Sequence, residues 1–443
     1  MTSILTRSIV SSPFKSARIM VATLLLVAGV PALGATPGRT FDVLHYVVDL
    51  SPEIDSGRVS GQATIVLKGV APTTELVFDA GDLEVATVVS GDLTLQHRKS
   101  GSSLRIALLK PLAVGEERTL TVTYQGRPRF GLEFHPDRSE VYTIFSTSQW
   151  MVCVDAPDER ATLDLTVRLP AGLKAAGVGR KLPSSDASIH RWRLDTPTPS
   201  YVYGFAAGRY AEFSETSRGI PLRYLSTERS PDELRRIFQE TADMLRFFGK
   251  RAGLHYRGTY TQVLVAKTIG QEMARLSLMS EAYGLRVLDD PTNVALVAHE
   301  AAHQWWGNLL TCQDWGHFWL NEGFANFMAA AWLEHRHGAE AYAEQVEGWR
   351  RRLEKLRADG KDKPLVYENW NKPTADDRAV VYQKGAYFLH LLRQELGEKA
   401  FWRGIRRYTR DHARRSVVTD DLRLAMEEAS KKDLADLFHE WAQ

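Results

Sequence analysis

The sequence predicts an α+β protein in which an all-β amino-terminal domain, sandwich-like or saddle-like, precedes a mainly helical domain. Three observations support this prediction. The chain has 443 residues, which is more than one ordinary hydrophobic core accommodates. Its content of 44% hydrophobic and 25% charged residues is typical of a folded globular protein. The spacing of apolar residues also changes near residue 226, from the period of strands to that of helices.

The predicted β domain covers residues 36–226. From Phe41 to about Ser226, short runs of alternating apolar and polar residues are separated by Gly, Pro, Asp and Ser. Examples of these runs are HYVVDL, GQATIVLKG, RTLTVTYQG and ATLDLTVRLP. Such alternation between turn residues is typical of half-buried strands, so this half of the chain is predicted to be all-β.

The predicted second domain covers residues 227–443. Ser230, Pro231 and Glu233 have the arrangement of a helix start with a capping box. Most of the later segments have the helical period and are separated by short loops that contain Gly or Pro. The exception is TYTQVLVA at 259–266, which predicts one strand within this domain.

The first 35 residues have the pattern of a secretory signal peptide. Arg7, Lys15 and Arg18 precede the apolar run IMVATLLLVAGV, and no acidic residue occurs up to Ala35. A membrane anchor is the weaker alternative, because the run has 12 residues and about 20 are needed to span a bilayer. We expect cleavage near Gly34 or Ala35, no stable membrane span afterwards, and a protein exported to the periplasm or secreted.

Charge and cysteine content exclude two further classes of protein. The 56 basic and 54 acidic residues nearly balance, and removal of the signal peptide brings them closer, so no electrostatic footprint for nucleic acid is expected. Cys153 and Cys312 are the only cysteines, so no dense disulfide framework holds the fold. We expect two separate buried thiols, although the sequence alone does not decide whether they pair.

The segment VAHEAAHQWWG, residues 297–307, has the spacing of a metal site. Pro291 fits the first turn of a helix and Gly307 fits its end, so a helix is predicted between them. On that helix His299 and His303 share one face, where both can bind one zinc ion. Glu300 is placed to hold a zinc-bound water. The alternative is that these are ordinary buried or surface polar residues, so a third ligand has to decide.

Glu322 supplies the missing ligand type. It lies near the start of the helical pattern WLNEGFANFMAAAWLEHRHG, with 18 residues between it and His303. Two helices joined by such a connection can pack side by side and complete a His, His, Glu set. We therefore predict one Zn²⁺ ion per chain, although cobalt or manganese would also suit these ligands. Asn326, one turn beyond Glu322, could hydrogen-bond a ligating histidine, but we expect it to be an ordinary helix-face asparagine.

This spacing, with Glu322 inside WLNEGFA, resembles the zinc aminopeptidases of family M1, which belong to the gluzincins. Three further segments extend the resemblance over nearly all of the chain after the signal peptide: CVDAPDERATLDLTV from Cys153, VYQKGAYFLHLLRQELGEKAF from Val381, and the final LADLFHEW. The resemblance implies a β-rich amino-terminal domain followed by a thermolysin-like catalytic domain, with the active cleft between them.

The resemblance also implies roles in peptide hydrolysis. Glu300 would act as the general base for the attacking water. Tyr382, in the matching context YQKGA, would stabilise the oxyanion of the tetrahedral intermediate. An ordinary tyrosine has a pKa of about 10, so its hydroxyl remains a donor at neutral pH. The expected partners are peptide substrates.

Recognition of the substrate's amino terminus is where the sequence departs from the family. Members carry a glutamate in a G-x-M-E-N motif, and GQEMARLSLMSE from Gly270 aligns Glu272 with it. Gln271 replaces the family's Met, and Met273 replaces its Asn. Glu272 can still pair with a substrate ammonium. Gln149, in STSQWMVC, is a candidate for a second contact to the amine.

The sequence therefore predicts a zinc-dependent aminopeptidase that releases single amino-terminal residues. Two alternatives remain: an endopeptidase or dipeptide-releasing enzyme of the same fold, and a catalytically silent, zinc-containing module that binds peptides. Larger family members continue with a helical domain that covers the cleft. A chain without that domain is expected to accept longer peptides or to be closed by another subunit. The preferred side chain, the physiological substrate and the oligomeric state are not indicated.

Overall fold

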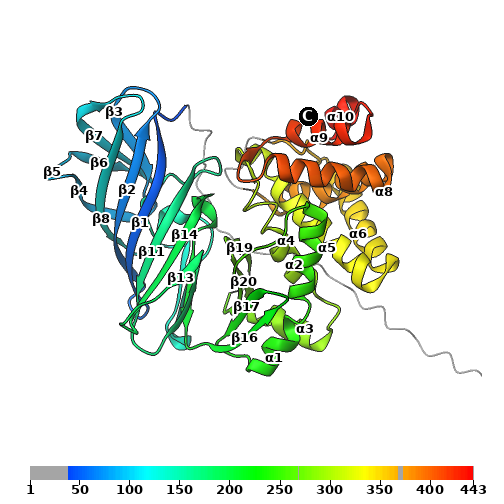
Figure 1. Ribbon diagram of the computed structural model, residues 1–443, viewed down its shortest axis with the longest axis horizontal. Coiled ribbons are helices and arrows are strands. Elements are labelled where there is room, and N and C mark those ends of the chain that lie inside the picture. Colours follow the sequence, from blue (N-terminus) through cyan, green and yellow to red (C-terminus); the bar gives the residue numbers. More distant parts are fainter. Residues whose placement is uncertain (1–37, 268, 368–372, 443) are drawn as a thin grey trace, which may run out of the picture.

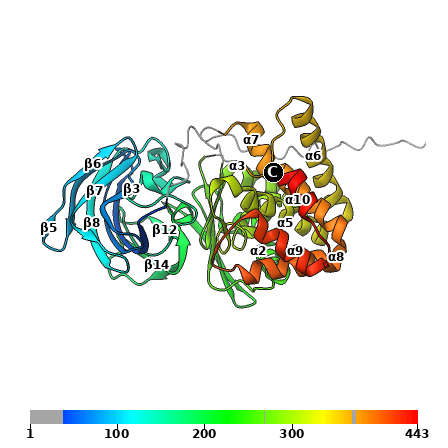
Figure 2. The same ribbon diagram turned by 90° about the horizontal axis from the view of Figure 1, so that it is seen from above.

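The computed structural model describes residues 38–267, 269–367 and 373–442, which form two lobes side by side (Figures 1 and 2). The predicted signal peptide lies outside the described residues. Within them, no helix is both long enough and apolar enough to cross a membrane. The order of the lobes, β-rich first and helical second, confirms the predicted fold class.

The first lobe, here called the β lobe, is built on an eight-stranded sheet. Its β1 pairs antiparallel with β2 and parallel with β11. The four quoted alternating runs lie in or overlap β1, β2, β8 and β11, as predicted. In sheet order the strands are β13 (Arg180–Leu182), β14 (Ile189–Pro199), β11 (Arg160–Arg168), β1 (Phe41–Glu53), β2 (Arg58–Gly69), β8 (Glu117–Gly126), β4 (Leu83–Ser90) and β5 (Leu93–Thr94).

Two smaller sheets complete the β lobe and enclose its apolar core. One contains β3 (Thr73–Asp79), β7 (Ser103–Leu112) and β6 (His97–Ser100). The other contains β12 (Lys174–Gly177), β15 (Phe205–Gly208), β10 (Glu140–Thr143) and β9 (Leu132–His135). Short 3₁₀ turns connect the strands: η1 (Pro136–Arg138), η2 (Thr147–Gln149) and η3 (Ser200–Val202). Cys153 is buried in this core, and it is a free thiol, as is the buried Cys312 of the second lobe.

A five-stranded sheet joins the β lobe to the second lobe, here called the helical lobe. In sheet order its strands are β16 (Ala211–Ser217), β17 (Ile220–Ser226), β18 (Tyr260–Val265), β20 (Leu276–Ser280) and β19 (Gly270–Met273). The strand predicted at 259–266 is β18. The predicted division at residue 226 falls at the end of β17, while β16 and β17 pair with the sheet that continues into the helical lobe.

Strand β18 explains why this sheet is buried on both faces. All six of its residues are buried. Tyr260 and Leu264 belong to the core of the helical lobe, whereas Val263 and Val265 belong to the core of the β lobe. Alternate side chains of a strand point to opposite faces. The sheet is therefore the wall between the two cores, and its edge strand β19 lies beside helix α4 (Ala295–Ala302).

The helices pack against this wall and against one another (Figure 1). The predicted start is confirmed: Ser230 caps α1, Pro231 is its first residue, and Glu233 completes a capping box. Besides α4, the helical elements are α1 (Pro231–Ile237), α2 (Thr241–Ala252), α3 (Glu281–Asp289), η4 (Trp315–His317), α5 (Trp319–His337), α6 (Ala339–Ala358), α7 (Ala375–Ala379), η5 (Val380–Lys384), α8 (Gly385–Asp411), α9 (Thr419–Ser430) and α10 (Ala435–Ala442). A two-stranded sheet links the loop after α4 to the loop between α8 and α9. Its strands are β21 (Thr311–Cys312) and β22 (Ser416–Val417).

The helix predicted between Pro291 and Gly307 is shorter than expected. The Asp290 carboxylate accepts hydrogen bonds from the Thr292 amide and hydroxyl, which holds Pro291 and Thr292 in a turn before the helix. The helix ends after Ala302, and the chain turns through residues 303–305 before it reaches Gly307, whose φ is +130°. The prediction of one helix over the whole segment was therefore wrong, although both histidines keep their relative placement.

Candidate active site and metal centre

Helices α4 and α5 bring together the three predicted metal ligands. The His299 and His303 Nε2 atoms lie 2.9 Å apart, and the Glu322 Oε2 atom lies 3.3 Å from the first and 3.4 Å from the second. Four ligands placed tetrahedrally at 2.0 to 2.1 Å from a zinc ion are about 3.3 Å apart. The three side chains are buried, and their separations suit one zinc ion.

The orientation of both imidazoles supports a cation between them. His299 donates its Nδ1 proton to Asn326 Oδ1, at 2.9 Å, and His303 donates its Nδ1 proton to the Trp306 carbonyl, also at 2.9 Å. In the neutral rings both Nε2 atoms then carry lone pairs. These lone pairs point toward each other and toward a carboxylate oxygen, an arrangement that is repulsive unless a cation lies between them.

The contact between Asn326 and His299 corrects the sequence analysis. We expected an ordinary helix-face asparagine, but Asn326 orients a candidate ligand. Its position one turn after Glu322 was a usable signal, because residues four apart share a helix face. The Trp306 carbonyl, in contrast, had no signal in the sequence.

Electrostatics within the cluster favour positive charge at the ligands. Burial lowers the pKa of His303, but the Glu322 and Glu272 carboxylates outweigh burial and raise that pKa to about 10. Burial raises the pKa of Glu322, but His303 and His299 outweigh it and lower that pKa to about 2. The carboxylate therefore stays ionised, and the cluster attracts a cation, which can be a proton or a metal ion.

Glu300 lies beside the three ligands without joining them. Its Oε2 atom is buried and has no hydrogen-bond partner among the described residues. Its Oε1 atom lies against the backbone of β19, where a Cβ on Gly270 would approach to within 2.4 Å. Burial raises the pKa of Glu300 well above its usual value. Gly270 thus leaves room for a carboxylate that faces the metal centre and remains available for proton transfer.

Strand β19 carries Glu272 into the same cluster. Its carboxylate lies close to Glu300 and His303, and only 4% of the residue is exposed. Burial raises the pKa of Glu272 to about 7, although His303 opposes the shift. Gln271 donates its amide to the Glu272 carbonyl at 2.8 Å and accepts a hydrogen bond from the Phe145 amide at 2.9 Å. The residue that replaces the family's Met therefore ties β19 to the β lobe.

Tyr382 reaches the cluster from η5, a π-helical turn between α7 and α8. Its ring is stacked 6.0 Å from that of His299, and the Glu322, Glu272 and Glu300 carboxylates lie near its hydroxyl. Burial, together with the nearby carboxylates, raises the pKa of Tyr382 well above its usual value. The hydroxyl is therefore a neutral donor beside the metal centre. A π-turn of this kind inserts one extra residue and often occurs at functional sites.

Gln149 is not brought into this cluster. The residue is buried in η2 of the β lobe, and its Oε1 atom accepts a hydrogen bond from the Asp82 amide at 3.2 Å. Its side chain packs against the backbones of Gly81 and Gly131, where added Cβ atoms would approach it to within 2.5 Å and 2.7 Å. The amide is thus engaged within the β lobe.

Comparisons with known proteins agree with this arrangement. Residues 43–202 match the peptidase M1 N-terminal domain, and residues 241–441 match the peptidase family M1 domain. The chain is 26% identical over 413 residues to leucine aminopeptidase 2 of Saccharomyces cerevisiae, covering 86% of this chain and 60% of the relative. It is 24% identical over 420 residues to a leukotriene A-4 hydrolase homolog of Botryotinia fuckeliana, covering 86% of this chain and 64% of the relative. The chain thus spans less than two thirds of the length of these relatives.

Solved structures show the same fold at nearly full length. An M1 zinc metallopeptidase of Deinococcus radiodurans superposes with a TM-score of 0.77 at 23% identity, over 91% of this chain and 94% of that one. A mutant of it bound to a Tyr-Ser-Ala substrate superposes with a TM-score of 0.78 at 24% identity, over the same shares of 91% and 94%. With both family domains matched in order and the two-lobe fold shared, the chain belongs to peptidase family M1.

Proposed function

We propose that the protein is a zinc-dependent aminopeptidase that hydrolyses the first peptide bond of peptide substrates. The observation that carries this proposal is the convergence of two imidazole lone pairs and one carboxylate, with a second buried carboxylate beside them. His299, His303 and Glu322 would hold the zinc ion. Zinc bound by three protein ligands supplies Lewis-acid activation of water and of the scissile carbonyl.

Glu300 is the proposed general base. Its buried Oε2 atom lacks a hydrogen-bond partner among the described residues, so it is free to accept a proton from the attacking water. Burial favours the protonated form that follows, because it penalises the charge on the carboxylate. Glu300 can then deliver this proton to the nitrogen of the leaving amine. Glu300 groups with Glu272 and His303 and is not one of the three proposed ligands, so it could hold water without occupying the metal.

Tyr382 is the proposed oxyanion donor. Its hydroxyl lies on the Glu322 side of the cluster, whereas Glu300 lies on the β19 side. A neutral donor at this place stabilises the negative charge that develops on the carbonyl oxygen as the water attacks. The raised pKa keeps the phenol protonated at neutral pH, so the donor is present throughout the reaction.

Glu272 is the proposed anchor for the substrate's free amine. An ammonium group beside this carboxylate would form a charge-assisted hydrogen bond in a buried site. The same contact would place the first peptide bond next to Glu300, because both carboxylates belong to one cluster. The retained Glu272 favours an aminopeptidase over an endopeptidase, although Gln271 and Met273 depart from the family motif.

Hydrolysis of aminoacyl anilides by the purified enzyme tests the proposal. We expect release of aniline that a chelator abolishes and added zinc restores, with Glu300→Gln inactive but still binding zinc. An acetylated substrate should be cleaved far more slowly than its free-amine form if Glu272 anchors the amine. Equal cleavage of both forms would indicate an endopeptidase. Stoichiometric zinc without turnover of any substrate would indicate a peptide-binding module.

We also propose that the protein is exported. The basic residues Arg7, Lys15 and Arg18 before the apolar run, together with the small residues up to Ala35, support this proposal. Amino-terminal sequencing of the protein from a native-like host should find a chain that begins near residue 35. A cytoplasmic protein that retains Met1 would contradict it.

A further inference from the structure

Arg160, the first residue of β11, is a half-buried cation with an unusual set of partners. No carboxylate among the described residues forms an ion pair with it, and its Nε atom has no hydrogen-bond partner there. Burial lowers the pKa of this guanidinium to about 10, so it still carries its charge at neutral pH. Partial burial of a charge that has no counter-ion reduces stability. A role beyond stability would explain why it is there.

The guanidinium binds one turn of the helical lobe. Its NH2 group donates to the Asn308 carbonyl at 3.0 Å and to the Leu309 carbonyl at 3.2 Å. Its NH1 group donates to the Thr311 hydroxyl at 3.0 Å. The planar fork of an arginine can satisfy several acceptors at once, which the single ammonium of a lysine does less well. Arg160 thus fixes the path of residues 308–311 from the opposite lobe.

The same turn contains the group that orients His303. The Trp306 carbonyl accepts the Nδ1 proton of this histidine, and the next residue, Gly307, has φ +130°. A Cβ on Gly307 would lie 2.8 Å from that Nδ1 atom, so the turn passes directly beside the ring. The Gly307 carbonyl accepts hydrogen bonds from Tyr201 at 2.8 Å and from Thr311 at 2.6 Å. Thr311 is the residue whose hydroxyl Arg160 holds.

A second branch of this network reaches Glu322. Tyr201, also from the β lobe, accepts a hydrogen bond from the Asn321 side chain at 3.0 Å. The side-chain Oδ1 atom of Asn321 in turn accepts a hydrogen bond from the Cys312 amide at 3.1 Å. Asn321 directly precedes Glu322 at the start of α5. Tyr201 therefore contacts both the turn after α4 and the start of α5, and Arg160 holds the same turn.

We propose that Arg160 is a positioning residue of the metal centre. From the β lobe it fixes the turn whose Trp306 carbonyl orients His303, and so it sets the direction of that ligand's Nε2 lone pair. Groups that orient a ligating histidine contribute strongly to metal affinity, and their loss weakens binding about 10- to 100-fold. Arg160 does not contact His303 itself but holds the turn that does. We therefore expect its loss to weaken zinc binding by the lower end of that range. This inference rests on the zinc of the proposed function.

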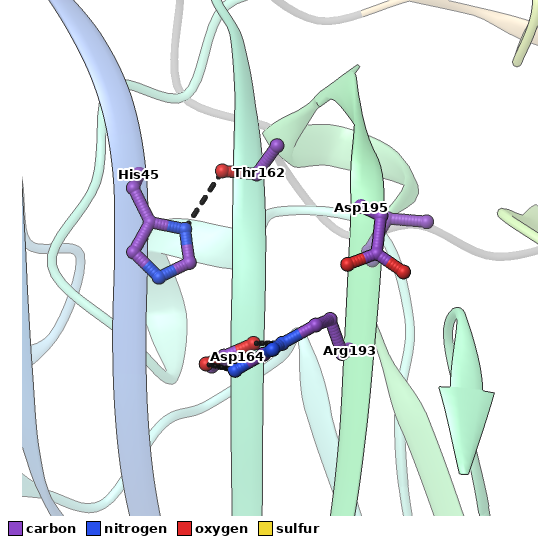
Figure 3. Close-up of a pocket in the computed structure, with 6 residues that line it drawn as sticks. His45, Thr162, Asp164, Arg193 and Asp195 are labelled. Carbon is purple, nitrogen blue, oxygen red and sulfur yellow. Dashed lines mark hydrogen bonds and ion pairs between the residues drawn. The ribbon is translucent and has the colours of Figure 1, made fainter. Parts of the chain in front are cut away.

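Arg193 offers a matched control within the same sheet. It lies on β14 and forms a bidentate ion pair with Asp164 of β11, with both N···O distances at 2.6 Å (Figure 3). Its side chain is 45% exposed, so the pair is an ordinary surface interaction. Figure 3 shows this pair beside His45, Thr162 and Asp195, all residues of the β lobe.

The experiment measures the zinc dissociation constant of the metal-depleted protein by competition with a chromophoric chelator. Wild type is compared with Arg160→Met, Arg160→Lys and Arg193→Met. We expect Arg160→Met to weaken zinc binding about tenfold, Arg160→Lys to weaken it less, and Arg193→Met to leave it unchanged. Thermal unfolding of the metal-free forms shows whether each variant is folded at the temperature of the measurement.

Each outcome decides the inference. Zinc affinity equal to wild type in a folded Arg160→Met would overturn it and leave Arg160 as a staple between the lobes. If Arg160→Met does not fold, the comparison of Arg160→Lys with wild type decides in the same way. A wild-type protein that binds no zinc would refute the proposed function itself, and this inference with it. Zinc binding that is weakened in the Arg160 variants but unchanged in Arg193→Met supports the positioning role.

Discussion

Gly323 of α5 and Gly385 of α8 lie in direct backbone contact, and a Cβ on Gly323 would approach the Gly385 Cα to within 2.9 Å. Glu322 precedes the first glycine, and Tyr382 lies three residues before the second. The close approach of these two helices therefore places the proposed third ligand beside the proposed oxyanion donor. Larger residues at these two positions would hold the two backbones further apart, and with them Glu322 and Tyr382.

Substitution of Gly323 by Ala should lower both stability and turnover. The added methyl group meets backbone on the other helix, so the helices must move apart, which typically costs about 1 to 3 kcal/mol. Gly348→Ala in α6 is the control, because no atom lies within 4 Å of its added Cβ. That control should gain about 0.5 to 1 kcal/mol. Denaturant unfolding of both variants, followed by anilide hydrolysis, checks this; a neutral Gly323→Ala would refute it.

Tyr382→Phe should reduce kcat about 10²- to 10³-fold, because it removes a donor that acts only as the oxyanion forms. KM should change little, and zinc should remain bound. Tyr387→Phe, in the first turn of α8 and packed against Trp441, should keep nearly full activity. Steady-state kinetics of both variants provide the test. A Tyr382→Phe enzyme with unchanged kcat would remove this residue from the mechanism.

Asn326→Ala should weaken zinc binding about 10- to 100-fold, because the Nδ1 proton of His299 loses its acceptor. Asn326→Asp keeps an acceptor oxygen at the same place and should retain tight binding. Chelator competition measures both. Similar zinc affinities for the alanine variant and wild type would show that packing alone orients His299.

Glu140 should make the protein less stable as the pH rises. The residue is buried where the lobes meet, and its carboxylate accepts hydrogen bonds from the Ala266 amide and the Tyr210 hydroxyl. Burial raises its pKa from 4.5 to about 7, with Glu281 adding to the shift and Arg138 opposing it. The native state therefore holds this proton to a higher pH than the unfolded state does. The stability it contributes is complete below pH 4.5 and is lost as the pH rises through about 7.

Glu140→Gln tests this expectation because the amide cannot ionise, while its oxygen can still accept from the Ala266 amide and its NH2 group can donate to the Tyr210 hydroxyl. The free energy of unfolding of the variant should fall less steeply than that of wild type over this pH interval. Above the interval the variant should be the more stable protein, by up to a few kcal/mol. Urea unfolding at several pH values measures the difference. Parallel pH curves for the two proteins would contradict the assignment.

The parts of the fold and the site that the sequence predicted correctly are those that local geometry determines. The strand period identified β1 and β18, and the capping box identified the start of α1, because each signal lies within a few residues. The two histidines lie one turn apart, so their shared face followed from helical spacing alone. Glu322 followed from the start of the next helical pattern.

Contacts between distant segments were not predictable in this way. The Trp306 carbonyl that orients His303 belongs to the backbone, which no residue type reveals. The direct contact between Gly323 and Gly385 depends on how two helices cross. Gln149 has a side chain suited to an amine, but its surroundings in the β lobe engage it elsewhere. Such features depend on tertiary packing, which a single sequence does not encode locally.

The pairing of β17 with β18 determines which fragments of the chain can be produced separately without exposing a sheet edge. The two strands run parallel from Leu222 opposite Tyr260 to Leu225 opposite Val263. A fragment that begins at residue 227 would lose β16 and β17 and leave β18, all of whose residues are buried in the full chain, at an open sheet edge. Such edges recruit other chains, so we expect this fragment to aggregate on size-exclusion chromatography. A fragment that begins before Ala211 keeps the edge covered and should aggregate less.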